Sequence, residues 1–237
     1  VHYQLGNMNQ SLYYYKQAYV IKKEIGDNKG EAGCLNNIGN IYRFQKDFHK
    51  AAETYLEAQK IYEKLNDSRG LTETYTNLGL AFFEQGLNSE AEEYFNKALI
   101  LAENNQNQSM VTNILANLAG LYNKQKKYDL AINTAIRSIE IAKELGIIKE
   151  IRNAYNHLSF SYEKKGDFKQ ALEKHKSFKE FNDSLMNSEK HEQITRMEAI
   201  YQSEKKQNQI ELFIKEKELQ DITITRQKVI LSIIAAS

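Results

Sequence analysis

The chain has 237 residues, no proline and a formal net charge of +1, from 32 lysine and arginine and 31 aspartate and glutamate residues. This length allows one large or two small domains, and the absence of proline disfavours loop-rich all-β folds and favours a nearly all-helical chain. The balanced charge gives no indication of a nucleic-acid or acidic partner. Because Cys34 is the only cysteine, an internal disulfide and a multi-cysteine zinc site are excluded.

Most of the chain consists of a 40-residue repeat. Four copies begin at Asn36, Thr76, Ala116 and Asn156, and the period projected backwards makes residues 1–25 the second half of an earlier copy. Residues of one kind recur at the same position of successive copies, and we call each such set a column. Several columns keep the same spacing, so the repeat predicts stacked copies of one structural unit. The columns are Gly39, Gly79, Ala119 and Ser159; Tyr42, Phe82, Tyr122 and Tyr162; Ser11, Ala51, Ala91, Ala131 and Ala171; and Ala18, Ala58, Ala98 and Ser138.

Each copy predicts two antiparallel helices. Leu35, Ile38 and Tyr42 form an apolar stripe on the first helix, and Ala51 and Tyr55 begin a second stripe on the next helix. The small residues allow close packing, and the aromatic residues fill the space between the helices. Polar turn clusters separate the helices and supply N-caps. Since one pair cannot bury its apolar faces alone, the sequence predicts an all-α solenoid.

The C-terminal part loses the repeat. Residues 182–228 contain neither glycine nor proline and predict one long charged helix, or two with a joint near residues 207–209. The apolar spacing breaks the heptad, so a coiled-coil homodimer and a capping helix without a dimer both remain open. Residues 229–237, VILSIIAAS, predict the start of a transmembrane helix that continues past Ser237, with a short docking tail as the alternative.

Residues 1 to about 181 resemble the tetratricopeptide repeat family. This resemblance implies a right-handed superhelix that binds a protein or peptide on its concave face. Three features depart from the family pattern: the proline at the end of the motif is absent, the period is 40 residues instead of 34, and the usual tryptophan position holds Leu35, Tyr75, Leu115 and Tyr155. The matching residues are Ile38-Gly39, Leu78-Gly79 and Leu118-Ala119, the aromatic residue three positions later, and the two alanine columns.

The segment DSLMNSEKHEQITRMEAIYQSEKKQNQIELFIKEKELQ resembles the region that follows the repeats in membrane signalling proteins of the Bacteroidetes type. That resemblance implies the sensor region of a membrane-bound protein such as a two-component histidine kinase, with extracytoplasmic (periplasmic) repeats and a kinase domain beyond Ser237. Arg226 and Lys228 precede the apolar run and favour the alternative, cytoplasmic repeats.

No set of residues in the sequence predicts catalysis. The five histidines have no spacing typical of metal ligands, and no phosphate-binding glycine motif occurs. Cys34 is expected to be a small packed residue. His191 lacks the proline-containing context of a phosphoaccepting histidine. The sequence therefore predicts a chain without enzymatic activity, metal or cofactor.

The expected binding surface is the face of each first helix that does not enter the core. One column there reads Asn37, Asn77, Asn117 and His157. Asparagine amides both donate and accept hydrogen bonds, so the column predicts contact with the main chain of an extended peptide. Amides that bond only to neighbouring helices are the alternative. The predicted peptide-binding residues are Asn36, Asn37, Asn40, Arg43, Asn77, Phe83, Asn113, Asn117, Asn123, Asn153, Asn156 and His157.

Two functions follow from the sequence. The first is the protein- or peptide-binding sensor region of a membrane-bound signalling protein, attached through its C-terminus. The second is a soluble cytoplasmic adaptor or peptide receptor, in which the last helix is a regulatory or dimerising arm. Neither function requires nucleic acid.

Overall fold

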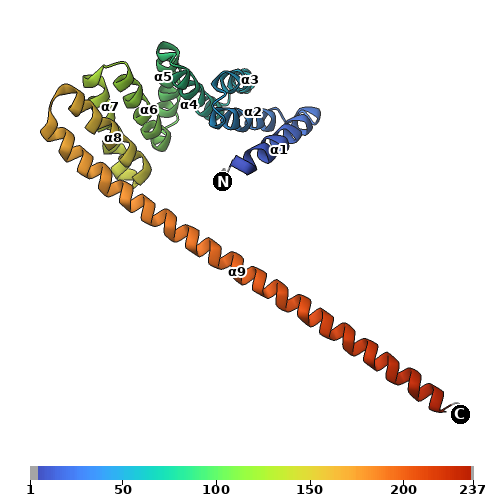
Figure 1. Ribbon diagram of the computed structural model, residues 1–237. Coiled ribbons are helices and arrows are strands. Elements are labelled where there is room, and N and C mark those ends of the chain that lie inside the picture. The colour runs from blue at the N-terminus through green and yellow to red at the C-terminus, as the bar shows by residue number, and fades with distance from the viewer. Residues whose placement is uncertain (1–4, 236–237) are drawn as a thin grey trace. The chain divides into compact units, whose positions relative to one another are not determined.

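The computed structural model describes the backbone of residues 5–235 and the side chains of residues 8–188, 190, 191, 195, 197–199, 202, 203, 205–217 and 219. The described residues form nine helices and no strand (Figure 1). The predicted fold class, an all-α right-handed superhelix of helix pairs with a long C-terminal helix, is confirmed. The helices are α1 (Leu5–Glu24), α2 (Asn28–Phe44), α3 (Phe48–Leu65), α4 (Ser68–Gln85), α5 (Asn88–Asn104), α6 (Gln108–Lys124), α7 (Tyr128–Leu145), α8 (Ile148–Lys165) and α9 (Phe168–Ala235).

The turns between helices share one backbone geometry. A residue with positive φ recurs every 20 residues, half the period of the sequence repeat. Its N–H and that of the next residue bond to carbonyls of the preceding helix, as Lys46 N bonds to Arg43 O (3.0 Å). Proline could not occupy this position, because its ring fixes φ near −65°. The positive-φ residues are Gly26, Lys46, Asn66, Gly86, Gln106, Lys126, Gly146 and Gly166.

The residue after each positive-φ position is the N-cap of the next helix. The Asp67 carboxylate accepts a hydrogen bond from Gly70 N (3.0 Å) and pairs with Lys29 Nζ (2.6 Å). These two donors, first the Gly70 amide and then Lys29, hold the pKa of Asp67 below its usual value. Asn107 caps α6 in the same way without a charge. Aspartate and asparagine therefore both serve as caps in this chain.

We expect Asp67→Ala to lower the free energy of unfolding by about 0.5–2 kcal/mol, the usual cost of losing an N-cap. Asp67→Asn should retain the cap but lose the charge. Because the folded state lowers the pKa of Asp67, its charged interactions stabilise the chain above about pH 4 and are lost as the pH falls through the lowered pKa. Urea unfolding at pH 7, 5 and 3 should show the stability gap between the wild type and Asp67→Asn closing in acid. A gap that does not change with pH would contradict this account.

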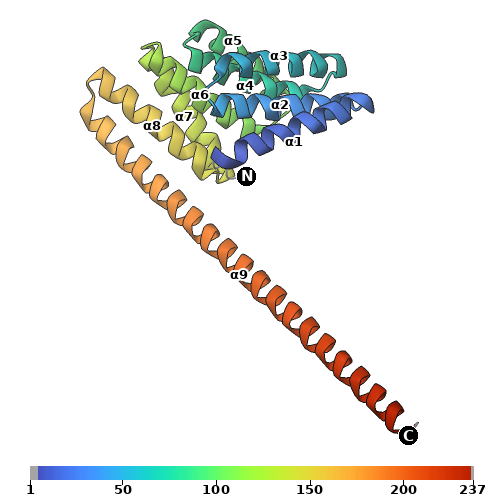
Figure 2. The same ribbon diagram turned by 45° about the vertical axis from the view of Figure 1, so that its right-hand side comes forward.

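The core lies between the two helices of each pair and between successive pairs. The glycine and alanine columns are buried from α2 onward, as the 40-residue repeat predicts, whereas Ser11 and Ala18 of α1 are half-buried. Gly39 and Gly79 lie so close to the rings of Tyr55 and Phe95 that an added Cβ would stand 2.5 and 2.6 Å from them. Each second helix α3, α5 and α7 contacts its own first helix and the first helix of the next pair (Figure 2).

The chain divides into two compact units, one ending at Asn182 and one beginning at Asp183. The first contains α1 to α8 and the start of α9, and the second is the rest of α9. Since α9 is one continuous helix to Ala235, the predicted alternative of a joint near residues 207–209 is wrong.

Within the described residues, no helix has both the length and the hydropathy needed to cross a bilayer. The predicted start of a transmembrane helix at residues 229–237 lies outside the described side chains, and residues 236 and 237 lie outside the described backbone. That assignment therefore stays a prediction from the sequence.

Candidate functional site: the exposed face of the first helices

The first helices of the pairs are α2, α4, α6 and α8, and each keeps one stripe of residues that does not enter the core. In α2 this stripe occupies positions spaced by four, three and four residues, between two buried stripes. All of its residues in the four helices are half-buried or exposed. We call it the first-helix face: Gly33, Asn37, Asn40, Phe44, Glu73, Asn77, Leu80, Glu84, Asn113, Asn117, Gly120, Lys124, Asn153, His157, Phe160 and Lys164.

Two of the predicted site residues instead tie neighbouring first helices together. Asn36 is buried, and its amide exchanges hydrogen bonds with Thr74 Oγ1 (3.0 and 3.2 Å). Asn123 is also buried; its Nδ2 donates to the carbonyl of His157 (3.0 Å), and its Oδ1 accepts from Ser161 Oγ (2.7 Å). These amides stabilise the stacking of pairs, so we do not include Asn36 and Asn123 in the candidate site.

Asn40 and Arg43 surround a buried tyrosine of the next helix. The Tyr55 hydroxyl donates to Asn40 Oδ1 (2.7 Å). Burial raises the pKa of Tyr55 to about 12, although the positive charge of Arg43 acts in the opposite direction. Arg43 also lies over the ring of Phe44, 5.2 Å from its centroid. Both residues are half-buried and already serve the packing of α3 on α2.

The third and fourth pairs are joined by a chain of polar side chains. Asn117 Nδ2 donates to Asn113 Oδ1 (3.3 Å), and Asn113 Nδ2 donates to Glu150 Oε1 (3.2 Å). Glu150 is buried, and its second oxygen has no hydrogen-bond partner among the described residues. Asn153 accepts two bonds from the neighbouring Arg152 (2.9 and 3.2 Å). In this part of the face, the asparagine amides therefore already make some hydrogen bonds within the protein.

Asn37 and Asn77 differ from the other members of their column. Both are half-buried on the first-helix face, and neither side chain makes a hydrogen bond to another described residue. Asn156 is exposed and likewise makes none. The amides of Asn37 and Asn77 lie one repeat apart and keep their donors and acceptors for a ligand.

His157, the last member of the column, is packed against a glycine. A Cβ at Gly120 would lie 2.9 Å from His157 Cε1, so only glycine leaves room for the imidazole. Burial lowers the pKa of His157. The side chain is therefore neutral at pH 7, with one ring nitrogen able to donate and the other to accept.

Cations lie over aromatic rings near the C-terminal ends of the first helices. Lys124 Nζ stands 4.4 Å from the centroid of the Phe83 ring and donates to the Phe83 carbonyl (2.8 Å). Lys164 Nζ stands 5.1 Å from the centroid of the exposed Phe160 ring. Sequence reasoning missed Lys164 and Glu73, because their columns hold a different residue type in almost every copy and so give no repeated signal.

The described residues provide no group of side chains suited to catalysis. No cluster of histidine, cysteine, aspartate and glutamate among them could hold a metal ion. Cys34 is buried, and burial raises the pKa of its thiol, so little reactive thiolate forms at neutral pH.

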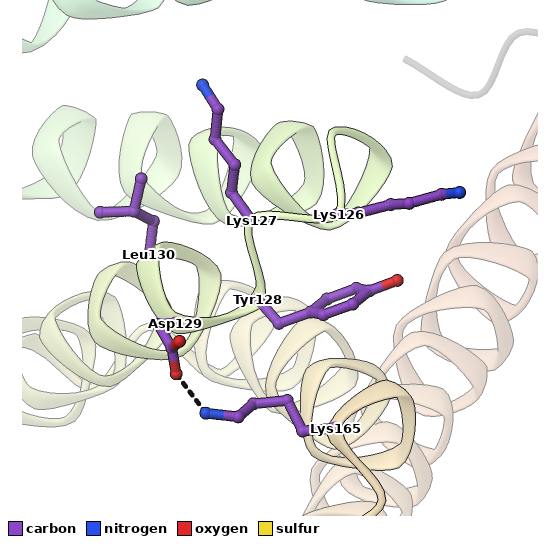
Figure 3. Close-up of a pocket in the computed structure, with 6 residues that line it drawn as sticks. All are labelled: Lys126, Lys127, Tyr128, Asp129, Leu130 and Lys165. Carbon is purple, nitrogen blue, oxygen red and sulfur yellow. Dashed lines mark hydrogen bonds and ion pairs between the residues drawn. The ribbon is translucent and has the colours of Figure 1, made fainter.

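A surface cavity of about 230 Å³ lies at the turn between α6 and α7, beside the end of α8 (Figure 3). Three of its charged groups are already engaged: Lys165 pairs with Asp129, and Lys127 Nζ lies 3.2 Å from Glu92. Tyr128 and Lys126 line the rest of the cavity together with Leu130. The cavity contains no nucleophile paired with a base.

The sequence matches a known family over its first helices. A tetratricopeptide repeat model matches residues 1–64 and 31–104. Among curated proteins, the mitochondrial tetratricopeptide repeat protein 19 homolog of Drosophila melanogaster is 33% identical over 84 residues, which are 35% of this chain and 23% of that protein. The chain therefore matches about a quarter of that relative's length.

Solved structures with the same fold share little sequence with the chain. BtubC from P. vanneervenii has a TM-score of 0.69 and 21% identity over 76% of this chain and 75% of its own. Aspartyl phosphate phosphatase F from Bacillus subtilis has a TM-score of 0.68 and 20% identity over 76% of this chain and 49% of its own.

A third structure is a signal transduction ATPase with a tetratricopeptide repeat sensor from Pyrococcus horikoshii. Its TM-score is 0.66, with 21% identity over 77% of this chain and 29% of its own. At these identities the likeness establishes the fold alone. The sequence match to the tetratricopeptide repeat family covers residues 1–104, and the helix pairs of the array have the fold of the tetratricopeptide repeat structures.

Proposed function

We propose that the chain is a protein-interaction module that holds an extended peptide along the first-helix face. The observation that carries this proposal is the pair Asn37 and Asn77, two half-buried amides one repeat apart whose side chains make no hydrogen bond to a described residue. Tetratricopeptide repeats typically serve as protein-binding scaffolds.

The column favours recognition of the peptide main chain. An amide can accept from a peptide N–H and donate to a peptide carbonyl at the same time, so Asn37 and Asn77 would each hold one peptide unit irrespective of its side chain. Asn117 would contribute its free oxygen, since its nitrogen bonds to Asn113. His157, the last member of the column, would donate or accept a hydrogen bond through its neutral imidazole.

Side-chain preference would come from the edge of the face where the first helices end. Phe83 with Lys124 and Phe160 with Lys164 each combine an aromatic surface with a positive charge. A ligand residue with an apolar body or an acidic group would interact favourably there. At the opposite edge, exposed Glu73 would disfavour acidic ligand residues.

The peptide-receptor interpretation of the sequence is better supported than the membrane-sensor interpretation. The similar structures named above include a phosphatase and a signal transduction ATPase with a repeat sensor, and none of them is a membrane histidine kinase. Membrane attachment through the C-terminus, and a homodimer through the C-terminal helix at residues 182–228, remain predictions from the sequence.

The test uses a peptide selected from a random phage-displayed library against the wild-type chain. We expect Asn37→Ala with Asn77→Ala to weaken its binding by up to about a hundredfold, because each lost hydrogen bond costs about 0.5–1.5 kcal/mol and 1.4 kcal/mol is tenfold. The melting temperature should not fall, since alanine is the better helix former.

The matched control is Asn133→Ala, which removes an exposed asparagine of the second helix α7. Its affinity for the peptide, measured by fluorescence anisotropy, should equal that of the wild type. Equal affinities for all three proteins would remove Asn37 and Asn77 from the ligand site and contradict the proposal.

A further inference from the structure

A surface cavity of about 370 Å³ lies where the turn between α5 and α6 passes the first turn of α4. This volume falls within the range of small-molecule sites. Its lining is polar apart from one methionine and contains a single charged side chain. The lining residues are Ser68, Arg69, Thr72, Asn105, Asn107 and Met110. The cavity therefore combines the size of a small-ligand site with one positive charge, that of Arg69.

The preceding junction of the array shows what a cation at this position normally contacts. Lys29 lies one repeat before Arg69, and its Nζ pairs with Asp67 Oδ2 (2.6 Å). Asp67 is the N-cap of α4, and the corresponding N-cap of α6 is Asn107. Because asparagine carries no charge, Arg69 lacks the carboxylate that Lys29 has. Arg69 is exposed, and its side chain makes no ion pair or hydrogen bond with a described residue.

The carboxylates of α4 on either side of Arg69 in the sequence do not neutralise it. Asp67 accepts a hydrogen bond from Gly70 N (3.0 Å) and is already paired with Lys29. Glu73, one turn further along the helix, is exposed and forms no ion pair with Arg69 within the described side chains. The positive charge of Arg69 therefore remains uncompensated beside the cavity.

The two asparagines of the lining keep donors whose acceptor ends are already used. Asn107 Oδ1 accepts from Met110 N (3.2 Å), and Asn105 Oδ1 accepts from Ser68 Oγ (3.1 Å). Neither Nδ2 group donates to a described residue. Since an anion only accepts hydrogen bonds, two free amide donors and a guanidinium suit an anion better than a cation.

We propose that this cavity is a binding site for the carboxylate of a small organic acid. The ligand carboxylate would stand to Arg69 as the Asp67 carboxylate stands to Lys29 at the preceding junction. The planar guanidinium suits bidentate binding of a carboxylate, and Asn105 and Asn107 would supply further donors. The cavity shares no residue with the first-helix face, so this site does not depend on the proposed peptide binding.

The probe is succinate, titrated at constant ionic strength into the ¹⁵N-labelled chain and followed through the side-chain amide resonances of Asn105 and Asn107. We expect saturable shifts with succinate and none with succinamide, which keeps the carbon skeleton without the charge. Arg69→Gln should weaken succinate binding by at least about tenfold, because hydrogen bonds to a charged group are lost. The matched control is Arg137→Gln, which removes an arginine already paired with Glu103 and should bind succinate as the wild type does.

A second variant, Asn107→Asp, supplies the missing carboxylate from the chain itself. Aspartate already caps α2, α3 and α4, so α6 should keep its cap. The new carboxylate should pair with Arg69, and succinate binding should be lost although Arg69 is unchanged. The pair should also raise the stability of the chain towards urea, and this gain should disappear in Asn107→Asp with Arg69→Gln.

Absence of saturable succinate binding, or its retention in Asn107→Asp, would overturn the proposal. An equal loss in Arg69→Gln and Arg137→Gln would also overturn it, since net charge alone would then explain the binding. Equal affinity for inorganic phosphate would contradict the assignment to a carboxylate. Tighter binding of a blocked tripeptide with a central aspartate than of succinate would contradict the small organic acid, because the carboxylate would then come from a protein partner.

Discussion

Replacing Phe95 by alanine is expected to lower the free energy of unfolding by about 3–5 kcal/mol, the largest stability effect that we predict for this chain. Phe95 is 1% exposed and belongs to the core cluster that joins the second and third complete pairs. Its ring fills the space that Gly79 leaves open. Loss of the ring would leave a cavity that the rigid helix backbones could close only in part.

Two variants test whether the burial of Phe95 causes this loss. Phe95→Leu retains much of the volume and should cost less than Phe95→Ala. Tyr122→Ala removes an aromatic residue that is only partly buried, with Lys127 Nζ 5.7 Å from its ring centroid, and should also cost less. Urea unfolding followed by circular dichroism would give the three values. A loss for Phe95→Ala no larger than that for Tyr122→Ala would contradict the assigned packing.

The repeat predicted the core because its residue types are set by packing. Gly39 and Gly79 recur 40 residues apart, and each faces an aromatic ring of its partner helix. The turns were harder to predict, because the positive-φ position is occupied by Gly86, Asn66 and Gln106 alike. Backbone hydrogen bonds fix that geometry, so residue type does not reveal the 20-residue spacing.

The candidate site was predicted less completely, because adjacent asparagines look alike in a sequence. Asn36 and Asn37 differ by one position, which is a rotation of about 100° around the helix axis. That rotation places Asn36 against Thr74 of the next first helix and leaves Asn37 on the first-helix face. Thr74 is 38 residues away, and only the stacking of pairs brings it near. Asparagine repeats in three successive copies in the column of Asn37, Asn77 and Asn117, whereas the column of Asn36 holds Thr76 and Ala116 in the next two copies.

Asn123→Ala should lower the free energy of unfolding by about 1–3 kcal/mol, because two buried hydrogen bonds worth about 0.5–1.5 kcal/mol each are lost. Both ends of its amide are bonded to α8, at the His157 carbonyl and the Ser161 hydroxyl. Its removal would leave the Ser161 hydroxyl bonded only to the His157 carbonyl (2.8 Å) and would loosen the contact between α6 and α8.

Asn77→Ala is the matched substitution for Asn123→Ala, since it changes the same residue type in the middle of a first helix. Its amide has no hydrogen bond to lose among the described residues, and alanine gains up to about 0.7 kcal/mol in helix propensity. Thermal and urea unfolding should therefore show Asn77→Ala as stable as the wild type or slightly more stable. If Asn77→Ala were as destabilised as Asn123→Ala, the amides of the column would be structural ties, and the first-helix face would lose the donors and acceptors on which its proposed peptide binding depends.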